Sequence, residues 1–217
     1  MNVSEAIAKR KSIRAFSDKK VDKELIRSLL EKAARSPSGG NVQPWRIYVL
    51  CGSTMYDFKD FLATHTEPES PEYAIYPEAL SEPYRSNRFK VGEDMYKLLN
   101  IPREDKAGRF ARLMENYNFF GAPAAFFCFV DRQMGPPQWS DLGMFLQSFM
   151  LLATEQGLGT CSQEAWAMRP KAVSKFVSSP DELMLFCGMA IGYAEETAVN
   201  TLSTDRTHVD EFATFIE

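Results

Sequence analysis

Two short segments near the N-terminus carry the side chains best suited to bind a ligand. The first, KRKSIR at positions 9–14, places Arg10, Ser12 and Arg14 at alternate positions, with Lys11 between them. An extended backbone there directs two guanidiniums and a hydroxyl to the same side. Guanidiniums bind phosphate through charge-assisted hydrogen bonds, so the segment predicts a phosphate site. The alternative is a solvated run of basic residues, which is the commoner role of such a pattern.

The second segment, SPSGGNVQPW at positions 36–45, is a polar, glycine-rich loop that ends in an aromatic residue. Gly39 and Gly40 lack side chains, so the backbone can approach a flat ligand closely. Ser38, Asn41 and Gln43 supply hydrogen-bonding groups for the rim of a ring. An ordinary loop between a helix and a strand is the alternative reading of this composition. The order and spacing of the two segments favour a flat ligand that carries a phosphate.

Bulk properties narrow the class of protein. The chain has 217 residues, 45% of them hydrophobic, which suits one α+β domain over residues 1–217. The net charge of −4 argues against a nucleic-acid partner, because binding to a polyanion needs an excess of Lys and Arg. The N-terminus is polar, and the most apolar helix candidate is interrupted by charges such as Asp141 and Glu155. We therefore expect a cytoplasmic protein without a membrane span.

The residues that mark other chemistries are missing or scattered. The four cysteines are far apart in sequence, which predicts free thiols, and His65 and His208 form no metal-ligand spacing, which predicts no metal site. The sequence contains no GxGxxG, GxxxxGK[ST], GxSxG or HExxH motif. Dinucleotide-fold, P-loop and hydrolytic readings therefore have little support.

The elements in the first half of the chain follow from hydrophobic spacing and proline. Residues 21–35 have the spacing of an amphipathic helix, residues 45–51 that of a buried strand, and residues 53–63 can form a second helix. Prolines recur through residues 65–88, so this segment, which is also rich in tyrosine, predicts a long ordered loop. Helices around 88–99 and 103–117 follow it. The whole insert, at about 65–117, is expected to act as a lid.

The second half predicts two further strands around a long apolar helix. The strands are at 122–130 and 183–194, and the helix is at 138–156. Apolar residues cover most of the circumference of that helix, so we expect it to be buried on most sides and to meet a partner subunit. The segment GLGTCSQEAW at 157–166 predicts a turn, and a helix around 170–178 follows it. The tail brings Arg206 before a final helical turn.

These segments together resemble the nitroreductase family of FMN-dependent flavoproteins along the whole chain. The resemblance implies that Arg10, Ser12, Arg14 and the C-terminal Arg206 hold the FMN phosphate. It further implies that a second group of residues follows the isoalloxazine ring and that a third faces the ring near its N5 atom. The second group is Pro37, Ser38, Gly39, Gly40, Asn41 and Gln43, and the third is Gln163, Glu164 and Ala165. Two positions depart from the family pattern, because Ser162 and Ala194 stand where proline is frequent.

The resemblance also implies a fold, an assembly and a reaction. The expected fold is a central, mostly antiparallel sheet flanked by helices, in an intertwined homodimer whose subunits share two FMN sites. The expected reaction is ping-pong, with NADH or NADPH as donor and a nitroaromatic compound, reduced to a hydroxylamine, as acceptor. Segments within residues 76–123 resemble the nitrobenzoate-reducing branch more narrowly, and Tyr84, Arg88 and Phe120 are candidate lid or substrate contacts.

Other functions of the same fold stay open at this point. A flavin or quinone reductase and a reductive dehalogenase would differ in the acceptor, and a flavin-binding protein without turnover would differ in class. No side chain is required as a nucleophile. Glu164 is read as a positioning carboxylate rather than an acid or base, and Trp139 and Trp166 as core residues rather than substrate contacts.

Overall fold

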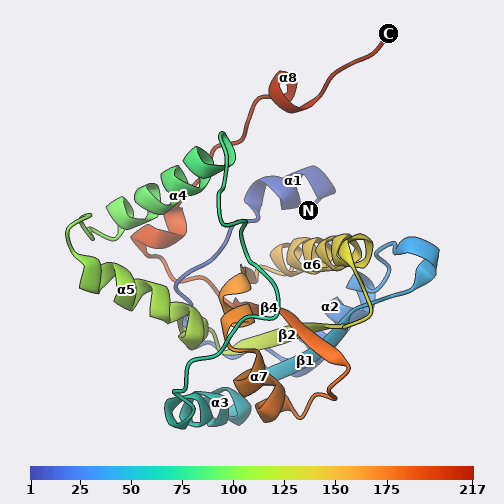
Figure 1. Ribbon diagram of the computed structural model, residues 1–217, viewed down its shortest axis with the longest axis vertical. Helices are drawn as coiled ribbons and strands as arrows, with labels where there is room; N and C mark the ends of the chain where they lie inside the picture. The colour runs from blue at the N-terminus through green and yellow to red at the C-terminus, as the bar shows by residue number, and fades with distance from the viewer.

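The computed structural model describes residues 1–217 and has a four-stranded antiparallel sheet at its centre (Figure 1). The strands are β1 (Arg46–Cys51), β2 (Ala124–Asp131), β3 (Gly159–Gln163) and β4 (Leu183–Gly192), in the order β1-β2-β4-β3. All three neighbouring pairs are antiparallel. The structure therefore confirms an α+β fold with an antiparallel sheet flanked by helices.

Helices cover both faces of the sheet because successive side chains of a strand point to opposite sides. Phe126 of β2 packs in a core with Phe149 of the long helix α6 and Leu29 of α2. Phe127, the next residue, packs on the other side with Phe58 of α3 and Trp166. The helices on these two faces are α2 (Lys23–Ala33) and α6 (Pro136–Glu155) on one side, and α3 (Ser53–Thr64) and α7 (Pro170–Val177) on the other.

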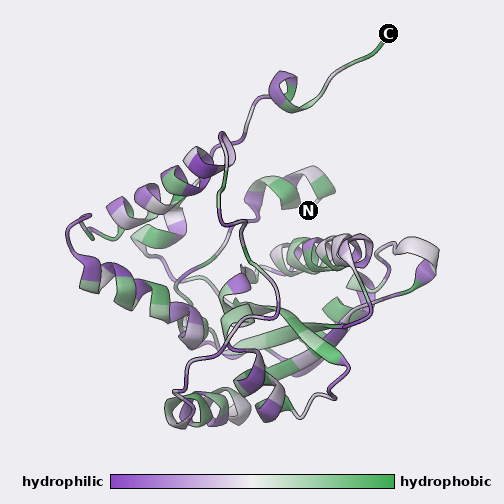
Figure 2. Cartoon of the chain, viewed as in Figure 1, coloured by the Kyte–Doolittle hydropathy of each residue, from purple (hydrophilic) through white to green (hydrophobic).

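Two helices, α4 (Tyr84–Leu98) and α5 (Lys106–Met114), lie to one side of the sheet (Figure 1). Their surfaces are more hydrophilic than the strands (Figure 2). Arg109 of α5 joins the two helices through both carboxylate oxygens of Glu93, with distances of 2.5 and 3.1 Å. The predicted loop over 65–88 is wrong for its last residues, because α4 already begins at Tyr84, after the last of the prolines. The predicted helix at 103–117 ends early, in a 3₁₀ turn, η2 (Glu115–Gly121).

Two strand predictions need correction. β1 is an edge strand that pairs only with β2, and of its residues only Leu50 is fully buried, so the predicted buried strand is wrong. The predicted turn at 157–166 contains β3, which pairs with β4 from Gly159 to Gln163. This segment has weak strand propensity, and its pairing with a long buried neighbour decides its conformation.

Short helical elements form at both ends of the chain, and some of them were not predicted from the sequence. α1 (Val3–Lys9) was not predicted; its start is stabilised by a capping box in which Asn2 and Glu5 accept from each other's backbone N–H groups. A 3₁₀ turn, η4 (Ala198–Thr201), precedes the tail, and α8 (Val209–Phe212) is the predicted final helical turn. The last residues extend away from the body (Figure 1). None of the helices has the length and apolar character needed to span a membrane.

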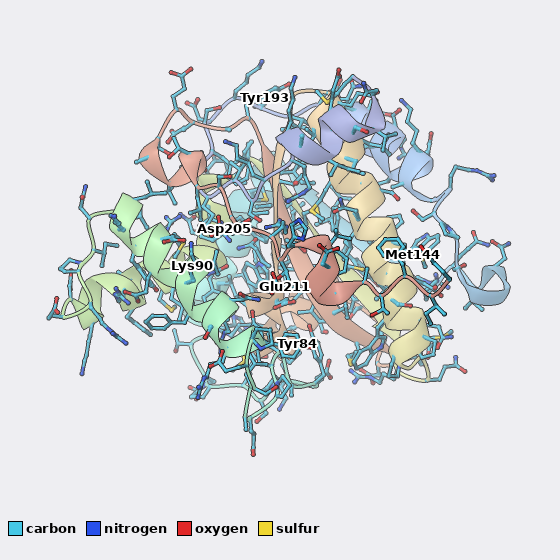
Figure 3. The ribbon with its side chains drawn as sticks, turned by 90° about the horizontal axis from the view of Figure 1, so that it is seen from above. Tyr84, Lys90, Met144, Tyr193, Asp205 and Glu211 are labelled. Carbon is cyan, nitrogen blue, oxygen red and sulfur yellow. The ribbon has the colours of Figure 1, made fainter.

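α6 is less enclosed than its sequence predicts. Phe145 and Phe149 are buried against the sheet, but Met144 projects from the opposite side of the helix and is 39% exposed (Figure 3). Met150, Leu151 and Leu152 are only partly buried. Within one chain, α6 therefore has one exposed large apolar side chain, Met144, and its predicted contact with a partner subunit stays a prediction.

Candidate cofactor and substrate site

The predicted phosphate-binding residues line one cavity of about 620 Å³, which we call the basic cavity. Arg10 follows α1, and the segment after it is extended, with Ser12 bridged to Thr160 and the N–H of Ile13 donating to the Thr160 carbonyl at 2.9 Å. The lining includes Arg10, Lys11, Ser12, Arg14, Gln147, Ser203, Thr204 and Arg206. Residues from opposite ends of the sequence therefore meet at one polar, strongly cationic site.

The cations of the basic cavity destabilise one another in the absence of an anion. Burial is the main cause that lowers the pKa of Arg10, and the positive charge of Arg206 lowers it further. Arg206 donates to Thr204 Oγ1 at 2.6 Å, and the backbone N–H of Arg14 donates to Asn200 Oδ1 at 2.8 Å. These contacts fix the positions of the arginines but supply no negative charge, so a phosphate would relieve the repulsion.

A second, mostly apolar cavity of about 420 Å³ lies next to the basic one, and Arg14 and Leu202 line both. We call it the apolar cavity. Its walls come from α4, from α5 with η2, and from β3 with the 3₁₀ turn η3 (Glu164–Met168). The lining includes Ile75, Tyr76, Arg88, Val91, Met95, Arg112, Tyr117, Phe120, Gln163, Glu164, Ala165 and Met168. A flat aromatic group is the kind of ligand that such walls accommodate.

The predicted segment from Gln163 to Ala165 forms one wall of the apolar cavity, and hydrogen bonds to residues of η2 hold it in position. The side chain of Gln163 is 2% exposed and donates to the Asn116 carbonyl at 2.7 Å. Tyr117 donates its hydroxyl hydrogen to the Ala165 carbonyl at 3.2 Å. Glu164 forms no hydrogen bond or ion pair with another side chain, and burial raises its pKa. The segment therefore offers mainly its backbone and the Glu164 carboxyl to the cavity.

Phe120 also lines the apolar cavity, on a strained stretch of backbone. Phe119, Phe120 and Gly121 all have left-handed φ values, of 50°, 55° and 82°. For bulky side chains this conformation costs on the order of 1–3 kcal/mol per residue and is typical of functional sites. The stretch buries Phe119 in the core while turning Phe120 toward the cavity.

Arg112 is a site residue that the sequence reasoning missed. Its guanidinium lies over the Phe120 ring, 5.0 Å from the centroid, and Nη2 donates to the Arg14 carbonyl at 2.9 Å. Arg112 lines the apolar cavity, and its Nε is buried without a hydrogen-bond partner. In sequence Arg112 is one charge on an amphipathic helix, where a solvated role is commonest, so no local signal distinguishes it.

The glycine-rich loop does not join these cavities within one chain. Gly39–Asn41 form the 3₁₀ turn η1 beside α6, and the N–H of Gly39 donates to the buried carboxylate of Asp141 at 3.2 Å. Gln43 closes the loop by donating its backbone N–H to Ser38 Oγ at 3.0 Å. None of the residues from Pro37 to Gln43 lines the basic or the apolar cavity. Asp141, read from the sequence only as an interrupting charge, anchors this loop.

The candidate lid residues separate in the structure. Arg88 and Phe120 line the apolar cavity, whereas Tyr84, 63% exposed, lines a different cavity between α4 and the C-terminal tail. Lys90 and Asp205 connect that helix and the tail through an ion pair of 2.8 Å (Figure 3). Trp166 is fully buried in the core, and neither it nor Trp139 lines either cavity. Ser162 lines the apolar cavity, and Ala194 pairs with Phe16 in an isolated bridge.

The fold and these cavities define a class of protein: an α+β protein with a cationic pocket for a phosphate joined to an apolar pocket for a flat ring. Residues 7–193 match the model of the Nitroreductase family, so the chain belongs to that family. The predicted family membership is thereby confirmed.

Individual relatives match nearly the whole chain. The 4-nitrobenzoate reductase of Pseudomonas putida is 35% identical over 212 residues, which cover 97% of this chain and 93% of the relative. The chloronitrobenzene nitroreductase of Comamonas testosteroni is 32% identical, over 99% of this chain and 96% of the relative. Among solved structures, the FMN and NADPH-dependent nitroreductase NfnB from Sphigopyxis sp. strain HMH is 45% identical, with a TM-score of 0.96 over 100% of both chains. NfnB from Mycobacterium smegmatis, solved in complex with NADPH, is 25% identical, with a TM-score of 0.92 over 99% and 98% of the two chains.

Proposed function

We propose that this protein is an FMN-dependent nitroreductase that oxidises NADPH or NADH and reduces nitroaromatic compounds. The observation that carries the proposal is the junction of the basic and apolar cavities at Arg14 and Leu202, which suits a phosphate-bearing flat cofactor with room beside its ring. The names of the relatives, among them nitrobenzoate and chloronitrobenzene reductases, support the acceptor class.

The residues present fit FMN. Arg10, Arg14 and Arg206, with the Ser12 hydroxyl, would hold the phosphate, because an anion offsets both the burial of Arg10 and its repulsion from Arg206, which together lower the pKa of Arg10. The guanidinium of Arg112, which lines the apolar cavity, suits a carbonyl or ring nitrogen at the edge of the flavin. When bound, FMN supplies the redox chemistry, accepting a hydride equivalent from the nicotinamide and passing two electrons on to the acceptor.

The protein residues around the apolar cavity orient the reactants and provide charge. Phe120 and the Arg14 carbonyl hold the Arg112 guanidinium in place, so that a fixed positive charge borders the cavity. A preorganised cation stabilises negative charge that develops during reduction. Tyr117 and Asn116 hold the 163–165 backbone from behind, which keeps its N–H and carbonyl groups in a constant position.

The size of the apolar cavity supports a ping-pong order. We infer that its volume of about 420 Å³ accommodates one aromatic reactant at a time beside the cofactor ring. The oxidised nicotinamide then has to leave before the nitro compound enters. We infer that the nitro group is reduced in successive two-electron steps, through the nitroso compound to the hydroxylamine.

We propose that a second copy of the chain supplies the glycine-rich loop, which does not line the basic or the apolar cavity of its own chain. The loop from Pro37 to Gln43 lies beside α6, outside both cavities, and α6 carries the exposed apolar side chain of Met144. A homodimer that pairs across α6 covers Met144 and brings the loop of one subunit to the cavities of the other. Each cofactor site then consists of residues from two chains.

The experiment that tests the function is an anaerobic absorption titration of the purified protein reconstituted with FMN. We expect a flavin spectrum that bleaches with NADPH or NADH and returns when 4-nitrobenzoate is added. Bleaching without reoxidation by any nitroaromatic compound would redirect the acceptor to a quinone, a free flavin or a halogenated substrate. Failure to bleach with either nicotinamide would make the protein a flavin binder without turnover, and failure to bind FMN would overturn the proposal.

A further inference from the structure

An arginine-rich cavity of about 390 Å³ lies where α4 meets α5 and the segment between them. The function proposed above assigns no role to this cavity. Four arginines contribute to its lining, together with Leu80, Phe89, Gly92 and Glu93; they are Arg85, Arg88, Arg103 and Arg109. We call it the arginine cavity. Its lining contains a single carboxylate, so it is a strongly cationic surface.

Two of these arginines are already neutralised by carboxylates. Arg109 holds Glu93 through both of its oxygens, and Arg85 pairs with Glu82 at 2.7 Å. Arg88 and Arg103 have no such partner among the ion pairs of the structure. The cavity therefore keeps two uncompensated positive charges.

The two unpaired guanidiniums are held in place by aromatic rings. Arg88 lies over the Tyr76 ring, 4.0 Å from its centroid, and Arg103 lies over the Phe89 ring at 5.1 Å. Stacking on a ring fixes the plane of a guanidinium but leaves the N–H groups along its edge free. A preorganised fork of this kind is what binds phosphate in two-point hydrogen bonds.

The arginine cavity and the apolar cavity share two lining residues of α4. Arg88 and Gly92, one helical turn apart, line both cavities. A side chain at Gly92 would meet no atom within 4 Å, and its φ lies outside the left-handed region, so neither packing nor backbone conformation requires glycine there. Glycine destabilises the interior of a helix relative to alanine. Because Gly92 has no side chain, no atom projects from α4 at this position, which borders both cavities.

We propose that the arginine cavity binds the 2′-phosphate of NADPH, with Arg88 and Arg103 as its ligands, while the nicotinamide lies in the apolar cavity. The inference rests on the proposed function, because it needs the nicotinamide beside the cofactor. NADPH carries a phosphate at its adenosine end that NADH lacks, and this is the group that two free guanidiniums distinguish. The site therefore selects NADPH over NADH.

The test compares donors in the FMN-loaded enzyme and in variants of exposed residues, which are expected to fold. Arg103→Ala is expected to lower the ratio of kcat/KM for NADPH to that for NADH by about tenfold, as a lost hydrogen bond to a charged group predicts. Arg88→Ala is expected to lower the same ratio. Arg27→Ala, which removes an exposed guanidinium from α2, is the control and leaves the ratio unchanged.

A binding measurement provides a readout independent of turnover. Adenosine 2′-monophosphate is titrated calorimetrically into the loaded enzyme, with adenosine 5′-monophosphate as the matched ligand. We expect Arg103→Ala to weaken the 2′-isomer about tenfold and the 5′-isomer much less. Equal effects on both isomers, or an unchanged donor ratio in Arg88→Ala and Arg103→Ala, would overturn the assignment. Absence of turnover with both donors in the unaltered enzyme would instead refute the proposed function.

Discussion

Arg10 and Arg206 come from opposite ends of the chain and face the same cavity. The proximity of Arg206 contributes to the lowered pKa of Arg10, and burial contributes more. In an apo protein this is an unfavourable arrangement of like charges. A bound phosphate converts the same arrangement into an attractive one, because each guanidinium then donates to an anion.

Loss of one of these arginines should therefore release the cofactor before it affects the fold. We expect Arg206→Ala to weaken FMN binding by about tenfold or more, because a hydrogen bond to a charged group is worth roughly 1.5–3 kcal/mol. Titration of the apoprotein by quenching of FMN fluorescence measures the affinity, and circular dichroism checks the fold. Arg27→Ala serves as the control, and an affinity in Arg206→Ala equal to that of the control would contradict the phosphate assignment.

Substitution of glycine by alanine is expected to have opposite effects on the free energy of unfolding at two positions. At Gly188 a Cβ atom would overlap the indole of Trp166, which is fully buried. We expect Gly188→Ala to lower the free energy of unfolding by about 1–3 kcal/mol, as overpacking of a core does. At Gly92 the space is open, so Gly92→Ala should raise the free energy of unfolding by roughly 0.5–1 kcal/mol. Urea unfolding of both variants measures the two changes in the free energy of unfolding. Changes of the same sign would show that the space around each glycine does not determine the effect of the substitution.

At the scale of elements, the α4–α5 unit supplies one wall of the apolar cavity and most of the arginine cavity. The ion pair between Glu93 and Arg109 connects the two helices. The hydrogen bond from Arg109 is the main cause that lowers the pKa of Glu93 below its ordinary value of 4.5. A carboxylate with a lowered folded-state pKa stabilises the fold above its unfolded pKa, and the contribution disappears as the pH falls through the folded value.

This linkage predicts a pH-dependent effect of Glu93→Gln. We expect the variant to have a lower Tm than the unaltered protein at pH 7, and the difference to shrink as the pH falls below the ordinary value of 4.5 and through the lowered folded-state pKa. Thermal unfolding across this range measures the difference. Glu31→Gln, on the exposed face of α2, controls for loss of a charge. A difference that persists unchanged at low pH would show that the ion pair does not stabilise the contact.

At the scale of the whole molecule, the predicted cofactor residues fall into two groups. The basic and apolar cavities contain the 10–14 segment, the 163–165 segment and Arg206, whereas the loop from Pro37 to Gln43 lies beside α6. If a homodimer joins the groups, each site takes one group from each subunit. A site shared between subunits predicts complementation between variants, which a measurement of the mass of the dimer does not test.

Two variants, each impaired in a different group, should complement each other in a mixed dimer. Arg14→Ala affects the basic cavity, and Asn41→Asp removes an amide donor while keeping a residue that tolerates the left-handed φ of 58°. A dimer with one copy of each variant has one doubly impaired site and one intact site. We expect co-expressed variants to bind more FMN than either variant alone, as measured by flavin absorbance per chain. FMN content equal to the average of the two variants would mean that each site belongs to a single chain.

The sequence by itself determined the features that depend on local spacing. The amphipathic pattern of residues 21–35, the apolar segments that became β2 and β4, and the long helix α6 were all predicted because helix and strand periods are visible within one segment. The motif residues around Arg10 and Gly39 were also predicted from short segments, through charge, hydroxyl groups and missing side chains.

Only the tertiary structure decided the features that depend on distant partners. β3 forms because β4 lies beside it, and Arg112 lines the apolar cavity because the strained turn at Phe119 and Phe120 sets the position of its supporting ring. The arginine cavity appears because α4 and the segment between α4 and α5 bring Arg88 and Arg103 to one surface. Burial, pairing and cavity shape arise from contacts between segments far apart in the chain, and a local pattern carries no information about them.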